Sequence, residues 1–285
     1  EYSDVIIGDY NYVFDPTVFL RRFFEEISAR YIFLIDEAHN LLDRARDMYS
    51  FSFRDSEFKE LRACFNINKH KKIIKVLDEV LLNFENNYDK YGKKLHYYTK
   101  NHIDSFDKIL LELAKKLEKF LIEEKDDRNY DYVLEMYFNI NSYLKISDYF
   151  MEGFYNVISF DEKNEDKIFE IKCVDPSYIL KKKYDYARST IFFSATLSPM
   201  PFFMDMLGAK ESLKLRLDMP FSSENLLILQ KSISTRYRDR SRNVSLISDL
   251  INDFISSKNG NYFIFFPSFS YLEAVAGDYS VRYSD

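Results

Sequence analysis

Two adjacent acids, Asp36 and Glu37, have the clearest potential for chemistry in the sequence. They directly follow the apolar run Tyr31 to Ile35, which is typical of a strand buried on both faces of a parallel sheet. Ligands of open α/β sheets gather at the carboxyl ends of such strands. A carboxylate there suits Mg²⁺, and a second one could orient or deprotonate a water that attacks a phosphoryl group. We therefore expect Asp36 to hold Mg²⁺ and Glu37 to activate water.

The same acids also suit a structural role, because Asp and Glu are favourable at the N-terminus of a helix. Ala38 and His39 complete the sequence DEAH. The four residues together favour nucleotide hydrolysis over helix capping, and they add His39 to the candidate catalytic residues.

A second short strand is predicted from Thr190 to Phe193. Hydroxyl groups at the carboxyl end of a strand can hydrogen-bond a neighbouring carboxylate or histidine. Such residues could sense the state of a nucleotide bound near the acids, although the segment is equally suited to a turn closed by two prolines. The candidate coupling residues after this strand are Ser194, Ala195 and Thr196.

Two further groups of side chains are candidate DNA contacts. Aromatic and amide groups that follow a predicted strand at Val5 to Ile7 could stack on and hydrogen-bond a single strand of DNA, although such aromatics more often simply pack a loop. Arginines in the loop STRYRDRSRN could contact phosphates, or lie free in solvent. A serine that opens a later helix could accept an anion at the helix N-terminus. These candidates are Tyr10, Asn11, Tyr12, Arg236, Arg240 and Ser268.

The middle of the chain, from about Asp43 to Tyr184, contains almost no Gly or Pro and predicts amphipathic helices. One helix follows the face Ile73 to Phe84, a second follows the seam Ile103 to Phe120, and a third runs from Tyr130 to about Phe150. A β-hairpin is predicted after them, from Val157 to Phe160 and from Ile168 to Cys173. Histidines 70, 96 and 102 lack the spacing of metal ligands, so we expect them to be solvated. Three lysine clusters could contact phosphates: Lys69 to Lys72, Lys93-Lys94 and Lys181 to Lys183. Acidic neighbours indicate that most of these lysines are solvated helix surface.

Elements typical of an α/β sheet flank this middle part. The expected helices are Val18 to Ser28 (capped by Thr17), Val244 to Ser257, and one opened by Pro267 and Ser268 and running through Leu272. The expected strands, besides those named above, are Leu226 to Leu229 and Tyr262 to Phe266.

Composition excludes several classes of protein. A net charge of −6 does not fit a compact basic nucleic-acid module, so any nucleic-acid path must be a local groove. Only Cys64 and Cys173 are present, which excludes a disulfide framework and a self-contained zinc or iron–sulfur site. The chain contains no apolar run long enough for a membrane span. We expect a monomeric protein of a reducing cytoplasm, bacterial in source, and a sequence opening with Glu1 suggests part of a longer protein.

Seven segments in order resemble the XPD/DinG family of superfamily two DNA helicases. DEAH alone is shared by many helicases, whereas SATLSPM and FFPSFSYL are more specific. The large segment between DEAH and SAT argues against an RNA-directed DEAH helicase. The segments are IIGDYNYVFDP, IDEAHNL, CVDPSYIL, TIFFSATLSPMPFFMDMLG, PFSSEN, STRYRDR and NYFIFFPSFSYL.

The resemblance implies an α/β fold, with incomplete RecA-like P-loop motor domains and a mostly α-helical Arch insertion. Residues 1–47 and 187–200 would belong to the first motor domain, 48–186 to the Arch with its β-hairpin, and 201–285 to the start of the second motor domain. The family hydrolyses ATP with Mg²⁺ and moves along single-stranded or forked DNA, usually five prime to three prime, in repair or replication.

Two family features are missing from this sequence. There is no GxxxxGK[ST] phosphate-binding loop, so the chain alone should not hydrolyse ATP. The cysteines that would bind a 4Fe–4S cluster are also missing, so such a cluster is possible only in the intact protein. A non-catalytic alternative remains, in which the helical insertion is a DNA- or protein-interaction module.

Overall fold

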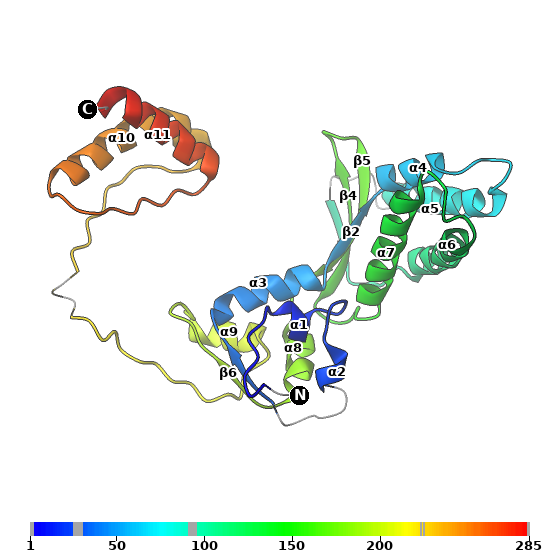
Figure 1. The fold of residues 1–285 in the computed structure, drawn as a ribbon, viewed down its shortest axis with the longest axis horizontal. Coiled ribbons are helices and arrows are strands. Elements are labelled where there is room, and N and C mark those ends of the chain that lie inside the picture. The colour runs from blue at the N-terminus through cyan, green and yellow to red at the C-terminus, as the bar shows by residue number, and fades with distance from the viewer. Residues whose placement is uncertain (1–2, 25–30, 91–95, 223, 225, 284–285) are drawn as a thin grey trace. The chain divides into compact units, whose positions relative to one another are not determined.

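In a computed structural model the chain divides into two compact units, residues 1–214 and 215–285 (Figure 1). The structure describes residues 3–24, 31–90, 96–222, 224 and 226–283. None of the helices in these ranges combines the length and the apolar character that a membrane crossing requires.

The first unit contains a parallel pair of strands, β1 (Tyr31–Ile35) and β6 (Ala187–Phe192). The apolar residues of helix α3 (Ala38–Met48) recur every three or four positions. One side of the helix therefore packs in a core that it shares with Ile35 of β1. Helices α1 (Asn11–Phe14), α8 (Ser177–Tyr184) and α9 (Met200–Met206) complete the lobe. Its core consists of Phe14, Ile35, Ala38, Leu41, Leu42, Ala45, Leu180 and Leu207.

The prediction that β1 is buried on both faces is wrong. Ile32 and Leu34 are 59% and 66% exposed, because within the described residues β1 pairs only with β6 and the core covers one face. The predicted strand Val5 to Ile7 is also wrong, since its residues are exposed and form no ladder. The predicted helix Val18 to Ser28 begins later than expected, because its described part is α2 (Arg21–Phe24). Residues 25–28 of the predicted helix lie outside the described ranges. Asp15, rather than Thr17, accepts the backbone hydrogen bonds of the preceding turn.

A largely helical insertion lies between β1 and β6 in the sequence. The three predicted helices are confirmed as α5 (Lys71–Lys90), α6 (Asp104–Glu123) and α7 (Tyr130–Ser147). The predicted hairpin is confirmed as β4 (Phe154–Asp161) and β5 (Asp166–Cys173). The sequence analysis did not predict helix α4 (Asp55–Ala63) or the short strands β2 (Phe51–Arg54) and β3 (His96–Thr99).

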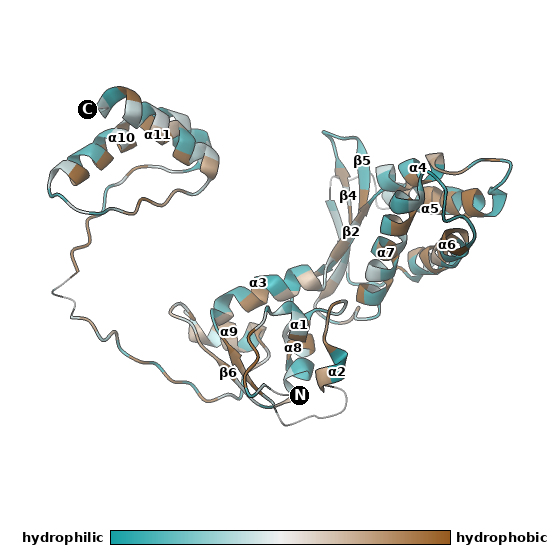
Figure 2. Ribbon diagram, viewed as in Figure 1, coloured by the Kyte–Doolittle hydropathy of each residue, from teal (hydrophilic) through white to brown (hydrophobic). Residues whose placement is uncertain are grey.

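The insertion's strands form one antiparallel sheet in the order β2-β5-β4-β3, against which its helices pack. The long helices carry both hydrophobic and hydrophilic residues, as Figure 2 shows. Their apolar faces form a core in which the ring of Phe106 lies 4.3 Å from that of Phe169 on β5. The insertion therefore has a hydrophobic core of its own, separate from the core of the β1–β6 lobe.

Two of the histidines predicted to be solvated are instead paired. His70 lies 3.1 Å from a carboxylate oxygen of Glu124. His102 lies 2.8 Å from Asp104 through Nδ1, and its Nε2 lies 3.0 Å from Asp107 and 2.8 Å from Ser147. Both histidines connect segments distant in sequence, which is why residue spacing did not reveal their partners.

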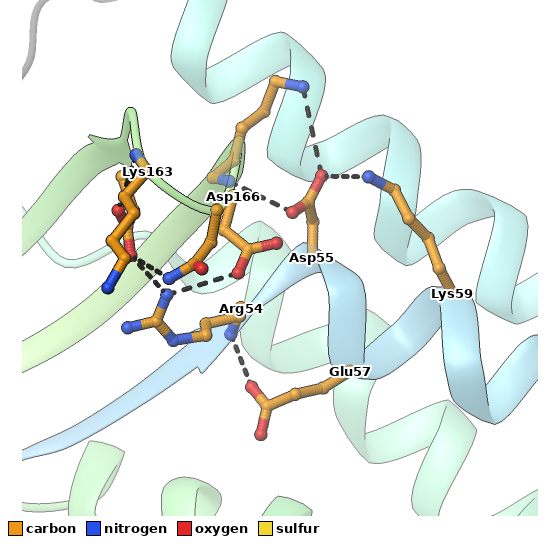
Figure 3. A network of polar contacts seen from close by, with 9 residues as sticks. Arg54, Asp55, Glu57, Lys59, Lys163 and Asp166 are labelled. Atoms are coloured by element: carbon orange, nitrogen blue, oxygen red, sulfur yellow. Dashed lines mark hydrogen bonds and ion pairs between the residues drawn. The ribbon is translucent and has the colours of Figure 1, made fainter.

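A network of charged side chains joins the sheet to helix α4 (Figure 3). The guanidinium of Arg54 donates to Asp161 at 2.9 Å and to Asp166 at 3.2 Å. Buried Asp55 accepts the backbone N–H of Lys167 at 3.0 Å and the ammonium of Lys59 at 2.8 Å. The network therefore fixes the start of α4 against β5.

Replacing Arg54 by glutamine is expected to raise the pKa of Asp161. Hydrogen bonds, first that of Arg54 and then that of Asn164, hold this pKa at about 2, below the usual 3.8. A lowered folded-state pKa stabilises the fold above the unfolded-state value, and this contribution is lost as pH falls from about 4 towards 2. An NMR titration of the Asp161 carboxyl checks the shift, with Arg62→Gln as control. An unchanged pKa in Arg54→Gln would contradict it.

The second unit contains a short 3-10 turn, Tyr237–Asp239, and helices α10 (Arg240–Ser256) and α11 (Phe269–Tyr283). The predicted helix Val244 to Ser257 is confirmed, and the predicted helix after Ser268 runs well beyond Leu272. The predicted strands Leu226 to Leu229 and Tyr262 to Phe266 are wrong. Their residues form no ladder and are largely exposed, because an apolar run becomes a strand only beside a pairing partner.

Residues 201–214, which we predicted to open the second motor domain, belong to the first compact unit. Buried Leu207 packs in the core of the β1–β6 lobe, and its carbonyl oxygen accepts the hydroxyl of Tyr184 at 2.8 Å. The assignment of motor and Arch domains to the predicted ranges stays a prediction.

Candidate active site

The two predicted motifs lie at the carboxyl ends of the two paired strands. The Phe193 N–H donates to the carbonyl oxygen of Ile35 at 3.0 Å, and the Ala38 N–H donates to the carbonyl oxygen of Phe193 at 3.1 Å. The acids after β1 and the SAT segment after β6 are therefore joined directly by backbone hydrogen bonds. About 150 residues of insertion separate the two motifs in the chain.

Glu37 has an unusual backbone conformation, with φ of 44° and ψ of 44°. This left-handed region is unfavourable for residues other than glycine, and such conformations concentrate at functional sites. The Glu37 N–H donates to the Asp36 carboxylate at 2.7 Å, which supports the turn. Both carboxylates are exposed, so they remain accessible to a ligand.

Four of the predicted residues form one hydrogen-bonded cluster. The Ser194 hydroxyl donates to the Glu37 carboxylate at 3.2 Å and lies 2.8 Å from Nδ1 of His39. The same ring nitrogen lies 3.2 Å from the Glu37 carboxylate and 3.2 Å from the hydroxyl of Thr196. The Thr196 N–H donates to the Ser194 hydroxyl at 3.1 Å. Ala195 is exposed, and its methyl side chain adds no polar group to this cluster.

Tyr10 lies beside the acids rather than free in a loop. Its hydroxyl donates to the carbonyl oxygens of Asp36 and Glu37, the latter at 3.1 Å. Burial, followed by the nearby Asp36 and Glu37 charges, raises the pKa of Tyr10, so the phenol stays protonated and can donate. Sequence reasoning did not find this support for the acid loop, because nothing in the local pattern links residue 10 to residue 36.

The other two predicted DNA contacts of the first unit differ in their surroundings. Asn11 and Tyr12 lie in helix α1 rather than in a loop. The side-chain oxygen of Asn11 accepts from Arg44 at 3.2 Å, whereas the Tyr12 ring is exposed. Whether these residues contact DNA stays a prediction.

In the second unit, two of the three predicted DNA contacts lie together. Arg240 donates to the hydroxyl of Ser268 at 3.2 Å, and this hydroxyl also accepts the N–H of Tyr271 at the start of α11. The Arg240 guanidinium carbon lies 5.7 Å and 5.4 Å from the ring centroids of Tyr237 and Tyr271. Arg236 is exposed.

The donor set of the site fits Mg²⁺ but not an iron–sulfur cluster. Exposed carboxylate oxygens suit Mg²⁺, which binds proteins through one or two carboxylates and keeps water and nucleotide phosphates as its other ligands. Asp36 is the residue that would hold it. Among the described residues no group of three metal-ligating side chains is present. A 4Fe–4S cluster takes four thiolates, whereas the chain has two cysteines, of which Cys173 is buried.

Comparisons with known proteins found similar sequences. A family model described as DEAD_2 matches residues 1–58, which include the acids. The ATP-dependent DNA helicase CHL1 of Debaryomyces hansenii is 27% identical over 290 residues, covering 86% of this chain. The chain is similar to a fragment of an XPD/DinG-like helicase. The resemblance recognised from the sequence motifs is thereby confirmed.

A solved structure titled XPD_Helicase is also similar, with a TM-score of 0.43 and 19% identity, covering 96% of this chain and 47% of that one. The XPD/DinG-like chain spans about a third of the length of the CHL1 relative, 34%. The structure of this chain confirms the predicted α/β fold class, with a parallel strand pair and a mostly helical insertion.

Proposed function

We propose that this XPD/DinG-like chain works as part of an ATP-dependent DNA helicase. One observation carries the proposal: Glu37, His39, Ser194 and Thr196 form a single hydrogen-bonded cluster at the ends of adjacent parallel strands. Ligands of open α/β sheets bind at this edge. The cluster thus unites a potential water-activating carboxylate with hydroxyl groups of a second segment that can respond to it.

In this proposal Glu37 accepts a proton from the water whose oxygen bonds to the γ-phosphorus of ATP, while the bond from that phosphorus to the β,γ-bridging oxygen breaks and its electron pair leaves with ADP. Asp36 would hold Mg²⁺, which would supply positive charge to the phosphates. His39, Ser194 and Thr196, with Ala195 in the turn between them, relay the occupied state of the site. Because the phosphate-binding loop is not in this sequence, the chain by itself is expected to be inactive.

The remaining finer assignments belong to the same proposal. Residues 1–47 and 187–200 act in the first motor domain, 48–186 as the Arch, and 201–285 as the beginning of the second motor domain. Tyr10, Asn11, Tyr12, Arg236, Arg240 and Ser268 are the proposed DNA contacts. The intact protein would act as a cytoplasmic monomer on single-stranded or forked DNA, five prime to three prime, in repair or replication.

Replacing Ser194 by alanine in the intact protein is expected to lower the stimulation of ATP hydrolysis by single-stranded DNA. The variant loses the hydroxyl that contacts both Glu37 and His39. A coupling free energy of about 1–3 kcal/mol corresponds to roughly 5- to 150-fold less stimulation, while hydrolysis without DNA changes less. Steady-state ATPase assays with and without an oligonucleotide check this, with Ser198→Ala as control. Equal stimulation in Ser194→Ala and the control would contradict the coupling role.

A strand-displacement assay on forked DNA tests the proposed function. The intact protein should release a labelled strand when ATP is present and should favour a fork with a five-prime single-stranded tail. A folded protein that binds the fork but releases no strand with either tail would contradict the helicase proposal. It would favour a non-catalytic interaction module, which is consistent with the separate core of the insertion.

A further inference from the structure

The antiparallel sheet of the insertion has one face that helices α4 to α7 do not cover. All four helices lie on the other side of the sheet (Figure 1). Phe154, Ile158 and Phe169 point to that side, where they are buried in the core of the insertion. Because successive side chains of a strand point to opposite faces, the residues between them point away from these helices. The second face therefore carries Tyr98, Tyr155, Val157, Glu170 and Lys172.

The register of the sheet places a lysine on each side of Tyr155. Tyr155 on β4 is the direct partner of Lys172 on β5. On the other side, the ammonium of Lys100, one residue beyond the end of β3, lies 5.8 Å from the centroid of the Tyr155 ring. Both lysines are exposed. The ring and the two cations therefore form one continuous row across three strands.

Tyr98 provides a second ring beside this row. It lies two residues before Lys100 on β3, and its partner on β4 is Val157, two residues after Tyr155. Diagonal neighbours of this kind are about 7–8 Å apart in an antiparallel pair. Tyr98 is 58% exposed, whereas Val157 is buried. Two rings and two ammonium groups thus share one surface, the tyrosine–lysine face, which consists of Tyr98, Lys100, Tyr155 and Lys172.

The charges of the tyrosine–lysine face favour an anionic ligand. Lys100 has no carboxylate partner within the part of the chain that the structure describes. Lys172 has one, because its ammonium lies 3.5 Å from a carboxylate oxygen of Glu170. Arg54, on the same side of the sheet, is already held by two aspartates. Two lysines therefore stand against one glutamate, which makes this surface locally positive on a chain of net charge −6.

We propose that the tyrosine–lysine face binds single-stranded DNA. Bases of any sequence stack on aromatic rings, and basic side chains next to the rings hold the phosphates. In this site bases lie on Tyr98 and Tyr155, while Lys100 and Lys172 contact the adjacent phosphates. An apolar protein surface would match the rings but would leave the two ammonium groups without partners. The strand is the one on which the proposed function acts, so the inference rests on that function.

Fluorescence anisotropy of a labelled oligothymidylate, titrated with the 285-residue chain, tests the stacking. Tyr98→Ala and Tyr155→Ala should each weaken binding by about 5- to 150-fold, the usual range for one stacked base. Tyr178→Ala is the matched control, because Tyr178 on α8 is 53% exposed and also has an ammonium, that of Lys182, 4.5 Å from its ring centroid. Affinity equal to that of the control in both variants would overturn the site and leave the face to a protein partner.

Two charge variants test the phosphate contact. Lys172→Gln should weaken binding several-fold and reduce the slope of log affinity against log salt by about 0.7, as for one contact on a single strand. Glu170→Gln should tighten binding, because its carboxylate competes with DNA for Lys172. Lys119→Gln is the control, since the Lys119 ammonium on α6 also lies 3.5 Å from a carboxylate, that of Glu123. An unchanged salt slope in Lys172→Gln, with no gain in Glu170→Gln, would contradict the contact.

Photochemical crosslinking of the wild-type chain locates the strand without any substitution. An oligothymidylate that contains one iodouracil should crosslink to Tyr98 or Tyr155, and mass spectrometry identifies the modified peptide. Crosslinks confined to other parts of the chain would overturn the site. Circular dichroism verifies that the variants are folded, and the crosslinking result decides where one is not. Because neither measurement requires ATP, a failure of ATP hydrolysis or strand displacement leaves both results unaffected.

Discussion

Replacing Glu37 by glutamine in the intact protein is expected to lower DNA-stimulated ATP hydrolysis by about 10²- to 10⁴-fold, the range typical of general-base catalysis. Glutamine keeps the size of the side chain and can still contact Ser194 and His39, but it cannot take a proton from water. The backbone turn is held by the Asp36 carboxylate and should persist. ATP binding should therefore be retained, and steady-state turnover with a nucleotide-binding titration checks both parts.

The matched control is Glu118→Gln, an exposed glutamate on α6 remote in sequence from the site. It should hydrolyse ATP at the wild-type rate. Full turnover by Glu37→Gln would show that another group activates the water. Loss of ATP binding together with turnover would instead assign Glu37 to nucleotide binding.

Replacing Phe106 by alanine is expected to destabilise the helical insertion by about 3–5 kcal/mol, the usual cost of removing a buried phenylalanine. Phe106 is fully buried. Its ring lies 5.3 Å from that of Phe84, 5.7 Å from that of Tyr143 and 4.3 Å from that of Phe169. Its loss would leave a cavity between α5, α7 and β5, which urea unfolding followed by circular dichroism would detect.

Phe138 provides the control, because it lies on α7 with its ring 59% exposed. Phe138→Ala should change the free energy of unfolding by no more than about 0.5 kcal/mol. A similar small change for Phe106→Ala would mean that the insertion does not depend on this aromatic core.

Helices in the insertion were predictable because their apolar residues repeat over many turns. The seam from Ile103 to Phe120 alone was enough to place α6. Strands β2 and β3, with four residues each, are too short for an alternating pattern to stand out. The apolar runs at Val5 and Leu226 have strand composition, but pairing partners decide strand formation, and a local pattern does not show them.

Much of the candidate site was also predictable. One motif directly follows each of two predicted strands, and parallel pairing brings the carboxyl ends of such strands together. Residue types placed Glu37, His39, Ser194 and Thr196 in one site, and the structure joins them by hydrogen bonds. Tyr10 was predicted as a DNA contact, and its hydrogen bonds to the acid loop were not predicted. These bonds join distant segments of the chain, for which the sequence has no periodic signal.

The most direct test of nucleotide hydrolysis at this cluster is ATP hydrolysis by the intact wild-type protein, measured with and without single-stranded DNA. We expect Mg²⁺-dependent hydrolysis that the DNA increases several-fold, because the acids and the SAT residues form one connected cluster. A folded protein that hydrolyses no ATP in either condition would contradict the assignment of this cluster to nucleotide hydrolysis.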